Sequence, residues 1–69
     1  MMGEVEAVVV EAKAFDLHGV RYRDVTVRYP DGGVEDARLG PEGAPDDLAA
    51  GEAVLVTRVA NMVVSIRRP

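Results

Sequence analysis

The single histidine of the chain is the residue best suited to acid–base chemistry, and it stands two positions after an aspartate. An Asp16-x-His18 pair could orient an imidazole as a general base. Such a base needs a nucleophile to act on, but the chain has no cysteine, and Ser65 stands in no nucleophile motif. We therefore expect His18 to be a solvated loop residue and the protein not to be an enzyme.

Two pairs of adjacent acids, Glu35-Asp36 and Asp46-Asp47, could supply oxygen ligands to a divalent cation. Neither pair has the spacing of an EF-hand, and capping and solubility explain them better. The glycine-bearing loops at Gly32-Gly33 and at residues 40–43 do not open a helix after a strand, so they do not predict phosphate binding. We expect no metal and no cofactor.

One cluster combines basic and aromatic side chains, as a single-stranded nucleic-acid site does. Its members are Arg21, Tyr22, Arg23 and Arg28. Three aromatic residues in the whole chain make a thin stacking platform, and a net charge of −4 repels a polyanion. We expect Tyr22 to point inward and the arginines to form a solvated row that pairs with Glu35 and Asp36 across a hairpin. Nucleic-acid binding is the alternative function.

The composition predicts one small domain over residues 1–69. A core of this size supplies only roughly 3–5 kcal/mol, and without cysteine no disulfide adds to it, so tight barrel closure or self-association must contribute. The first residues do not form a signal peptide, and no apolar run approaches the ~20 residues that span a bilayer. We expect a cytoplasmic protein without a membrane partner. Seven arginines against one lysine are typical of a GC-rich bacterial genome.

Runs of β-type residues, rich in valine, fill nearly all of the chain. The five runs are Val5–Ala14, Val20–Tyr29, Val34–Leu39, Ala53–Val59 and Met62–Arg67. The first is long and changes from alternation to three consecutive valines, which is typical of a strand that bends and serves two sheets. Residues 15–19 then form a connection. In the second run, Val20 and Tyr22 are out of phase with the later apolar residues, which predicts a β-bulge at Arg23-Asp24.

Turn chemistry separates the runs. Asp31-Gly32 predicts a hairpin with a glycine bulge. After a loop rich in proline and glycine, Asp46 as an N-cap, Leu48 as an inward anchor and Gly51 as a stop predict one short helical turn. The last two runs are joined through Ala60-Asn61, with the asparagine in the left-handed conformation.

The order of three strands, a short helical link and two strands is that of an OB-type barrel, a five-stranded Greek-key fold. An SH3-like barrel is the alternative; it more often has its helical turn before the last strand, so we favour the OB order. Residues 34–39, 48–56 and 63–68, with the core Leu-x-x-Gly-Glu-x-Val-Leu-Val, resemble the second half of small OB modules of phage tail and baseplate proteins and bacterial accessory proteins. The resemblance covers about half of the chain, implies the fold and an assembly role, and carries over no site residue.

Three runs are apolar on both sides of the strand, although a small barrel should have one wet side. They are Val8-Val9-Val10, Val54-Leu55-Val56 and Met62-Val63-Val64. If the first and fourth strands pair, as the OB order requires, an apolar patch results, and such patches usually mark an interface. The candidate interface residues are Val9, Val54, Val56, Met62 and Val63. We predict a non-enzymatic module that acts by protein–protein contact, most simply as a homo-oligomer.

Overall fold

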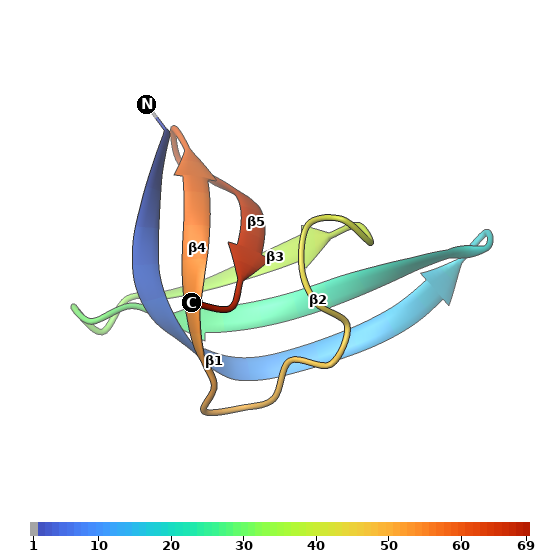
Figure 1. Ribbon diagram of the computed structural model, residues 1–69, viewed down its shortest axis with the longest axis horizontal. Coiled ribbons are helices and arrows are strands. Elements are labelled where there is room, and N and C mark those ends of the chain that lie inside the picture. The colour runs from blue at the N-terminus through green and yellow to red at the C-terminus, as the bar shows by residue number, and fades with distance from the viewer. Residues whose placement is uncertain (1) are drawn as a thin grey trace.

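Five antiparallel strands curl into a half-barrel in the computed structural model, which describes residues 2–69 (Figure 1). They are β1 (Met2–Leu17), β2 (Val20–Arg28), β3 (Val34–Leu39), β4 (Ala53–Val59) and β5 (Met62–Arg67). No helix occurs within this range, and the predicted all-β class with five strands is confirmed. The bounds of the last three strands are those predicted. β1 is longer than predicted at both ends, because residues 2–4 pair with β4 and residues 15–17, expected in a connection, continue the ladder with β2.

The sheet order is β3-β2-β1-β4-β5, and β1 is the strand that joins its two halves. Residues 2–8 of β1 pair with β4, and residues 8–17 pair with β2. Figure 1 shows the bend of β1 between these halves. The predicted bend of the first strand is therefore confirmed, but its two halves belong to one five-stranded sheet and not to two sheets. The edge strands β3 and β5 approach each other across the open side without forming a ladder.

A β-bulge in β1 lets both halves of this strand contribute to the core. The register with β2 shifts between Val9 and Glu11, so Val10 is the extra residue. Val9 before the bulge and Ala12 after it both pack in or against the core, which an unbroken two-residue period would forbid. A register shift between β4 and β5 makes Val64 the extra residue of β5 in the same way.

β2 is regular where the sequence predicts a bulge. Arg23 and Asp24 pair in continuous register with both neighbouring strands, so the predicted bulge at this position is wrong. β3 ends at Leu39, which is the partner of Arg23. Because the two-residue alternation along β2 is unbroken and turns Val25 and Val27 inward, Val20 and Tyr22 lie on the outer face instead of pointing inward.

Among residues 3–69, ten buried apolar side chains form the core inside the curled sheet. They are Ala7, Val9, Val25, Val27, Leu39, Ala44, Leu48, Val54, Val56 and Ile66. Ala44 and Leu48 come from the loop between β3 and β4, so the predicted inward anchor is confirmed. The predicted helical turn in this loop is wrong, because the loop consists of turns that are bonded to the strands. The Gly51 N–H donates to the Val9 carbonyl at 2.7 Å, and the Ile66 N–H to the Gly43 carbonyl at 2.7 Å.

The turn between β2 and β3 has the glycine-bulge form that the sequence predicts. The Gly32 N–H donates to the Tyr29 carbonyl at 2.9 Å, and the Tyr29 N–H to the Gly33 carbonyl at 2.8 Å. Gly32 has a φ of 89°, in the region where a Cβ is unfavourable. The hairpin predicted at Asp31-Gly32 is confirmed.

Two further turns place non-glycine residues in the left-handed region. His18, with φ 51°, and Gly19, with φ 78°, form the two-residue turn between β1 and β2, as a type I′ turn requires. Ala60 has a φ of 57° between β4 and β5, whereas Asn61 has no positive φ. The prediction for the asparagine is wrong because the first of the two turn positions, not the second, takes this conformation.

Candidate interaction surface

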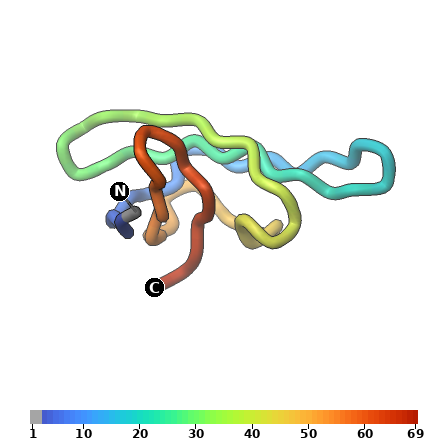
Figure 2. Tube along the Cα trace, turned by 90° about the horizontal axis from the view of Figure 1, so that it is seen from above, coloured from blue at the N-terminus to red at the C-terminus, as the bar shows by residue number. Residues whose placement is uncertain are grey.

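The only histidine is exposed at the tip of the hairpin of β1 and β2, an arm that projects beyond the rest of the sheet (Figure 2). The neighbouring Asp16 carboxylate lies 3.4 Å from the Arg21 guanidinium. Within residues 2–69, no three acidic, cysteine or histidine side chains are grouped so that they could hold a metal ion. The same range contains no helix that is long and apolar enough to cross a membrane.

The four residues predicted to contact nucleic acid do not share one surface. Arg21 and Arg23 lie on the inner side of the arm, whereas Tyr22 and Arg28 lie on its outer side. Arg23 is only 9% exposed, and its guanidinium lies 3.8 Å from a carboxylate oxygen of Asp46, which is also 3.6 Å from Arg21. The alternation of side chains along β2 therefore separates the two pairs.

Glu35 and Asp36 do not pair with an arginine row on β2 as predicted. Asp36 lies opposite Thr26 in the ladder and accepts a hydrogen bond from its hydroxyl at 2.6 Å. Glu35 faces the inner side, where Arg58 of β4 lies 3.2 Å away. The prediction is wrong because the register of the hairpin places neither acid beside an arginine of β2.

Tyr29, Glu35 and Arg58 connect the end of β2 with β3 and β4 across the open side of the half-barrel. The Tyr29 hydroxyl donates to one oxygen of Glu35 at 2.6 Å, and Arg58 donates to the other at 3.2 Å. These hydrogen bonds, first that of Tyr29, hold the pKa of the Glu35 carboxyl below its ordinary value, although burial opposes them. Burial, followed by the bond to Glu35, raises the pKa of Tyr29 to about 12. Both oxygens of Glu35 are thus bonded within the cluster, which links the strands across the open side.

Three of the five residues predicted for an interface lie in the core. Val9, Val54 and Val56 are at most 1% exposed, so they cannot reach a partner without unfolding. Val63 packs against the core, and Met62, which is 61% exposed, is the first residue of β5. The registers of β1 and β4 turn the buried valines inward and their immediate neighbours outward.

The outward neighbours form a row across four strands on the outer face of the sheet. Val8 of β1 pairs with Ala53 of β4 on one side and with Arg28 of β2 on the other, and Arg28 pairs with Val34 of β3. Val8 is 44% exposed and Val34 is 57% exposed. This outer row consists of Ala53, Val8, Arg28 and Val34. Sequence reasoning missed it as a unit, because only the registers bring these residues together.

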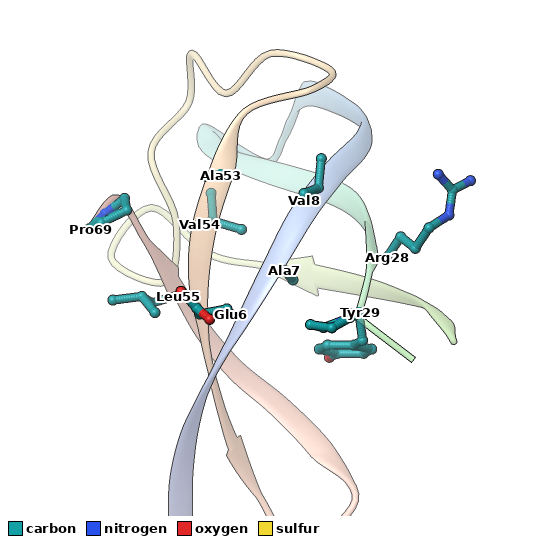
Figure 3. A pocket seen from close by; sticks show the side chains of 10 residues that line it. Glu6, Ala7, Val8, Arg28, Tyr29, Ala53, Val54, Leu55 and Pro69 are labelled. Atoms are coloured by element: carbon teal, nitrogen blue, oxygen red, sulfur yellow. The ribbon is translucent and has the colours of Figure 1, made fainter. Parts of the chain in front are cut away.

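A depression of the surface lies over Ala53, Val8 and Arg28 of this row, where β4, β1 and the end of β2 meet. It is a groove of about 480 Å³ with mostly apolar walls. Its outer-face residues are Glu6, Val8, Arg28, Ala53 and Leu55, and we call it the outer groove. Figure 3 shows Glu6 and Arg28 on opposite sides of β1, with Val8 between the neighbouring strands. Grooves of this size with few polar groups are typical of binding sites.

A second apolar area covers the outer side of the arm. Phe15 and Tyr22 are cross-strand partners whose rings stack with centroids 5.7 Å apart. The Arg38 guanidinium lies 4.8 Å from the centroid of the Phe15 ring. Leu17 and Val20, the next pair along the arm, are exposed. The sequence analysis placed Phe15 and Leu17 in a connection and expected Val20 and Tyr22 to point inward. It therefore did not predict this apolar area.

No model of a known protein family, no curated protein and no solved structure matches the chain. The geometry of the outer face, with its apolar row and groove, is therefore the basis for a function.

Proposed function

We propose that this protein is a non-enzymatic module of the cytoplasm that acts by protein–protein contact and associates with itself. The observation that carries the proposal is the apolar outer face. Within residues 3–69, nine large apolar side chains are exposed, among them Val8 and Val34 of the outer row, although the core of this range holds only ten residues. A small domain that leaves this much apolar surface uncovered is stabilised when a partner covers it.

An OB-type fold is part of this proposal. Its support is the pairing of β1 with β4, which the OB order requires, together with the resemblance of the second half of the chain to small OB modules. The short helical link expected in that fold is replaced here by turns. The assembly role of the phage and bacterial modules that the chain resembles agrees with self-association.

Sedimentation of the chain at high micromolar concentration tests the proposal. We expect a mass above that of the monomer, and a Val8→Glu variant should remain folded and lose this association. Val9→Glu is not the right probe, because Val9 is buried and a charge there would unfold the domain. A monomer over the whole concentration range contradicts self-association.

A titration of labelled single-stranded DNA and RNA tests the alternative function. We expect no binding at physiological salt, because the arginines of β2 face opposite sides and two of them already contact Asp46. Submicromolar affinity that falls steeply with salt, and that is lost when Arg21 and Arg23 are both replaced, would favour nucleic-acid binding over assembly.

A further inference from the structure

Resting on the proposed self-association, we infer that the outer groove is the contact between two copies, and that Glu6 of each copy binds Arg28 of the other. The two copies would be related by a two-fold axis near Val8. Both charged residues line the same groove on the outer face. The partner is then a second copy of this chain, and the contact of Glu6 with Arg28 sets its orientation.

Arg28 differs from the other arginines of residues 2–69 in having no carboxylate partner. Those that do form ion pairs are Arg21, Arg23, Arg38, Arg58, Arg67 and Arg68. Arg28 is exposed in the middle of an apolar row, where only Val8 and Val34 flank it in the ladder. An unpaired guanidinium in such surroundings fits a carboxylate that arrives with an apolar partner surface.

Glu6 is the acidic residue of the groove that matches Arg28. It is exposed, lines the same groove and forms no ion pair within residues 2–69, whereas the preceding acid of β1, Glu4, binds Arg67 at 2.7 Å. The groove thus presents one unsatisfied charge of each sign. A surface of this kind is complementary to itself, because in a two-fold interface residue i meets residue j and residue j meets residue i.

The register places the two charges symmetrically enough for such an axis. Arg28 is the direct partner of Val8 on β2, and Glu6 lies two residues before Val8 on the same face of β1. Arg28 lies across the strands from Val8, and Glu6 lies along β1 from it. A two-fold axis that lies in the interface, passes near Val8 and bisects these two directions brings Val8 against its own copy and each Glu6 toward the opposite Arg28. A standard interface covers about 800 Å² per partner, which is less than a fifth of the 4463 Å² that the chain exposes.

Charge reversal in two variants and their mixture tests this contact. In Glu6→Arg the new arginine faces Arg28 of the other copy, and in Arg28→Glu the new glutamate faces Glu6. Each interface contains the contact twice, so we expect the dimer dissociation constant of each variant to rise at least tenfold, as like charges do across an interface. When the two variants are mixed in equal amounts, both contacts become Arg–Glu pairs again, and association should return to that of the parent chain.

Matched controls carry the same charge changes outside the groove. Glu42→Arg, on the loop after β3, and Lys13→Glu, on β1, alter exposed side chains without ion pairs in residues 2–69 and should leave the dissociation constant unchanged. Circular dichroism checks that each variant folds. If a reversal does not fold, Glu6→Gln and Arg28→Gln replace it, with an expected weakening of roughly threefold.

The outcomes separate this inference from the function on which it rests. A parent chain that stays monomeric overturns both. A parent chain that associates with unchanged affinity after either reversal overturns the Glu6–Arg28 contact and leaves self-association standing. Weakened variants that do not recover on mixing also overturn the contact, because the two charges then act on other partners.

Discussion

The same substitution to alanine should cost much more stability at Val9 than at the adjacent Val8. Val9 is 1% exposed and contributes to the core, whereas Val8 is 44% exposed and points out of the sheet. Both belong to β1, so Val9→Ala and Val8→Ala change the β-propensity of the same strand by the same amount. The difference between the two variants therefore isolates the cost of removing buried methyl groups.

The burial of each side chain sets the size of this difference. Val9→Ala removes two buried carbons, worth about 0.8 kcal/mol each, or about 1.6 kcal/mol before any cavity and propensity costs. With those costs we expect a loss of about 2–3 kcal/mol in the free energy of unfolding, against at most about 1 kcal/mol for Val8→Ala. In a domain whose core supplies roughly 3–5 kcal/mol, the first change removes about half of the stability.

Urea and thermal unfolding at low micromolar concentration, where association does not contribute, measure the two losses. A difference of about 1.5 kcal/mol between the variants corresponds to about 6–12 °C in melting temperature for a domain of this size. Equal losses, or a larger loss for Val8→Ala, would refute the assigned register of β1 with β4 and β2. At high concentration Val8→Ala should also weaken the proposed self-association, whereas folded Val9→Ala should not.

Four further predictions concern the open side of the half-barrel and the turn between β4 and β5. The pKa of Glu35 is lower in the folded chain than its ordinary 4.5, so its contribution to stability is present above that pH and is lost as the pH falls below it; Glu35→Gln should flatten the acid limb of a urea-midpoint profile. The pKa of Tyr29 is raised from 10.0 to about 12, so stability should fall as the pH rises through this window, and Tyr29→Phe should remove that loss. Ala60→Gly should raise the free energy of unfolding by up to about 1 kcal/mol, because the left-handed cost of alanine exceeds the entropy that glycine adds to the unfolded chain. Asn61→Gly, whose φ is not positive, should lower it by about 0.5–1 kcal/mol in the same thermal scan, and the reverse order would contradict the turn geometry.

Local patterns in the sequence were sufficient for the elements of this fold. Runs of valine with two-residue alternation predicted five strands, and the bounds of β3, β4 and β5 agree with the structure. Asp31-Gly32 predicted its hairpin because glycine tolerates the positive φ that the turn needs. These successes share one cause: strand alternation and turn conformation depend on residues that are neighbours in the chain.

The side on which each valine lies depends on the tertiary structure. In a run such as Val8-Val9-Val10 every residue is equally apolar, so composition cannot say which one faces the core, and a single bulge reverses the answer. The predicted interface residues Val9 and Val54 are buried for this reason, and the bulge predicted in β2 lies in β1 instead.

The candidate site at the outer groove also depends on the register between strands. Glu6 and Arg28 are 22 positions apart, and the ladders among β4, β1 and β2 bring both to the outer groove. Which arginine remains without a carboxylate is also a tertiary property, since ion pairs such as Arg67 with Glu4 and Arg58 with Glu35 join distant strands. The sequence alone determined that the chain forms strands with an excess of apolar residues. Strand pairing decided where that excess is exposed, because only the register between strands assigns each side chain to the core or to the surface.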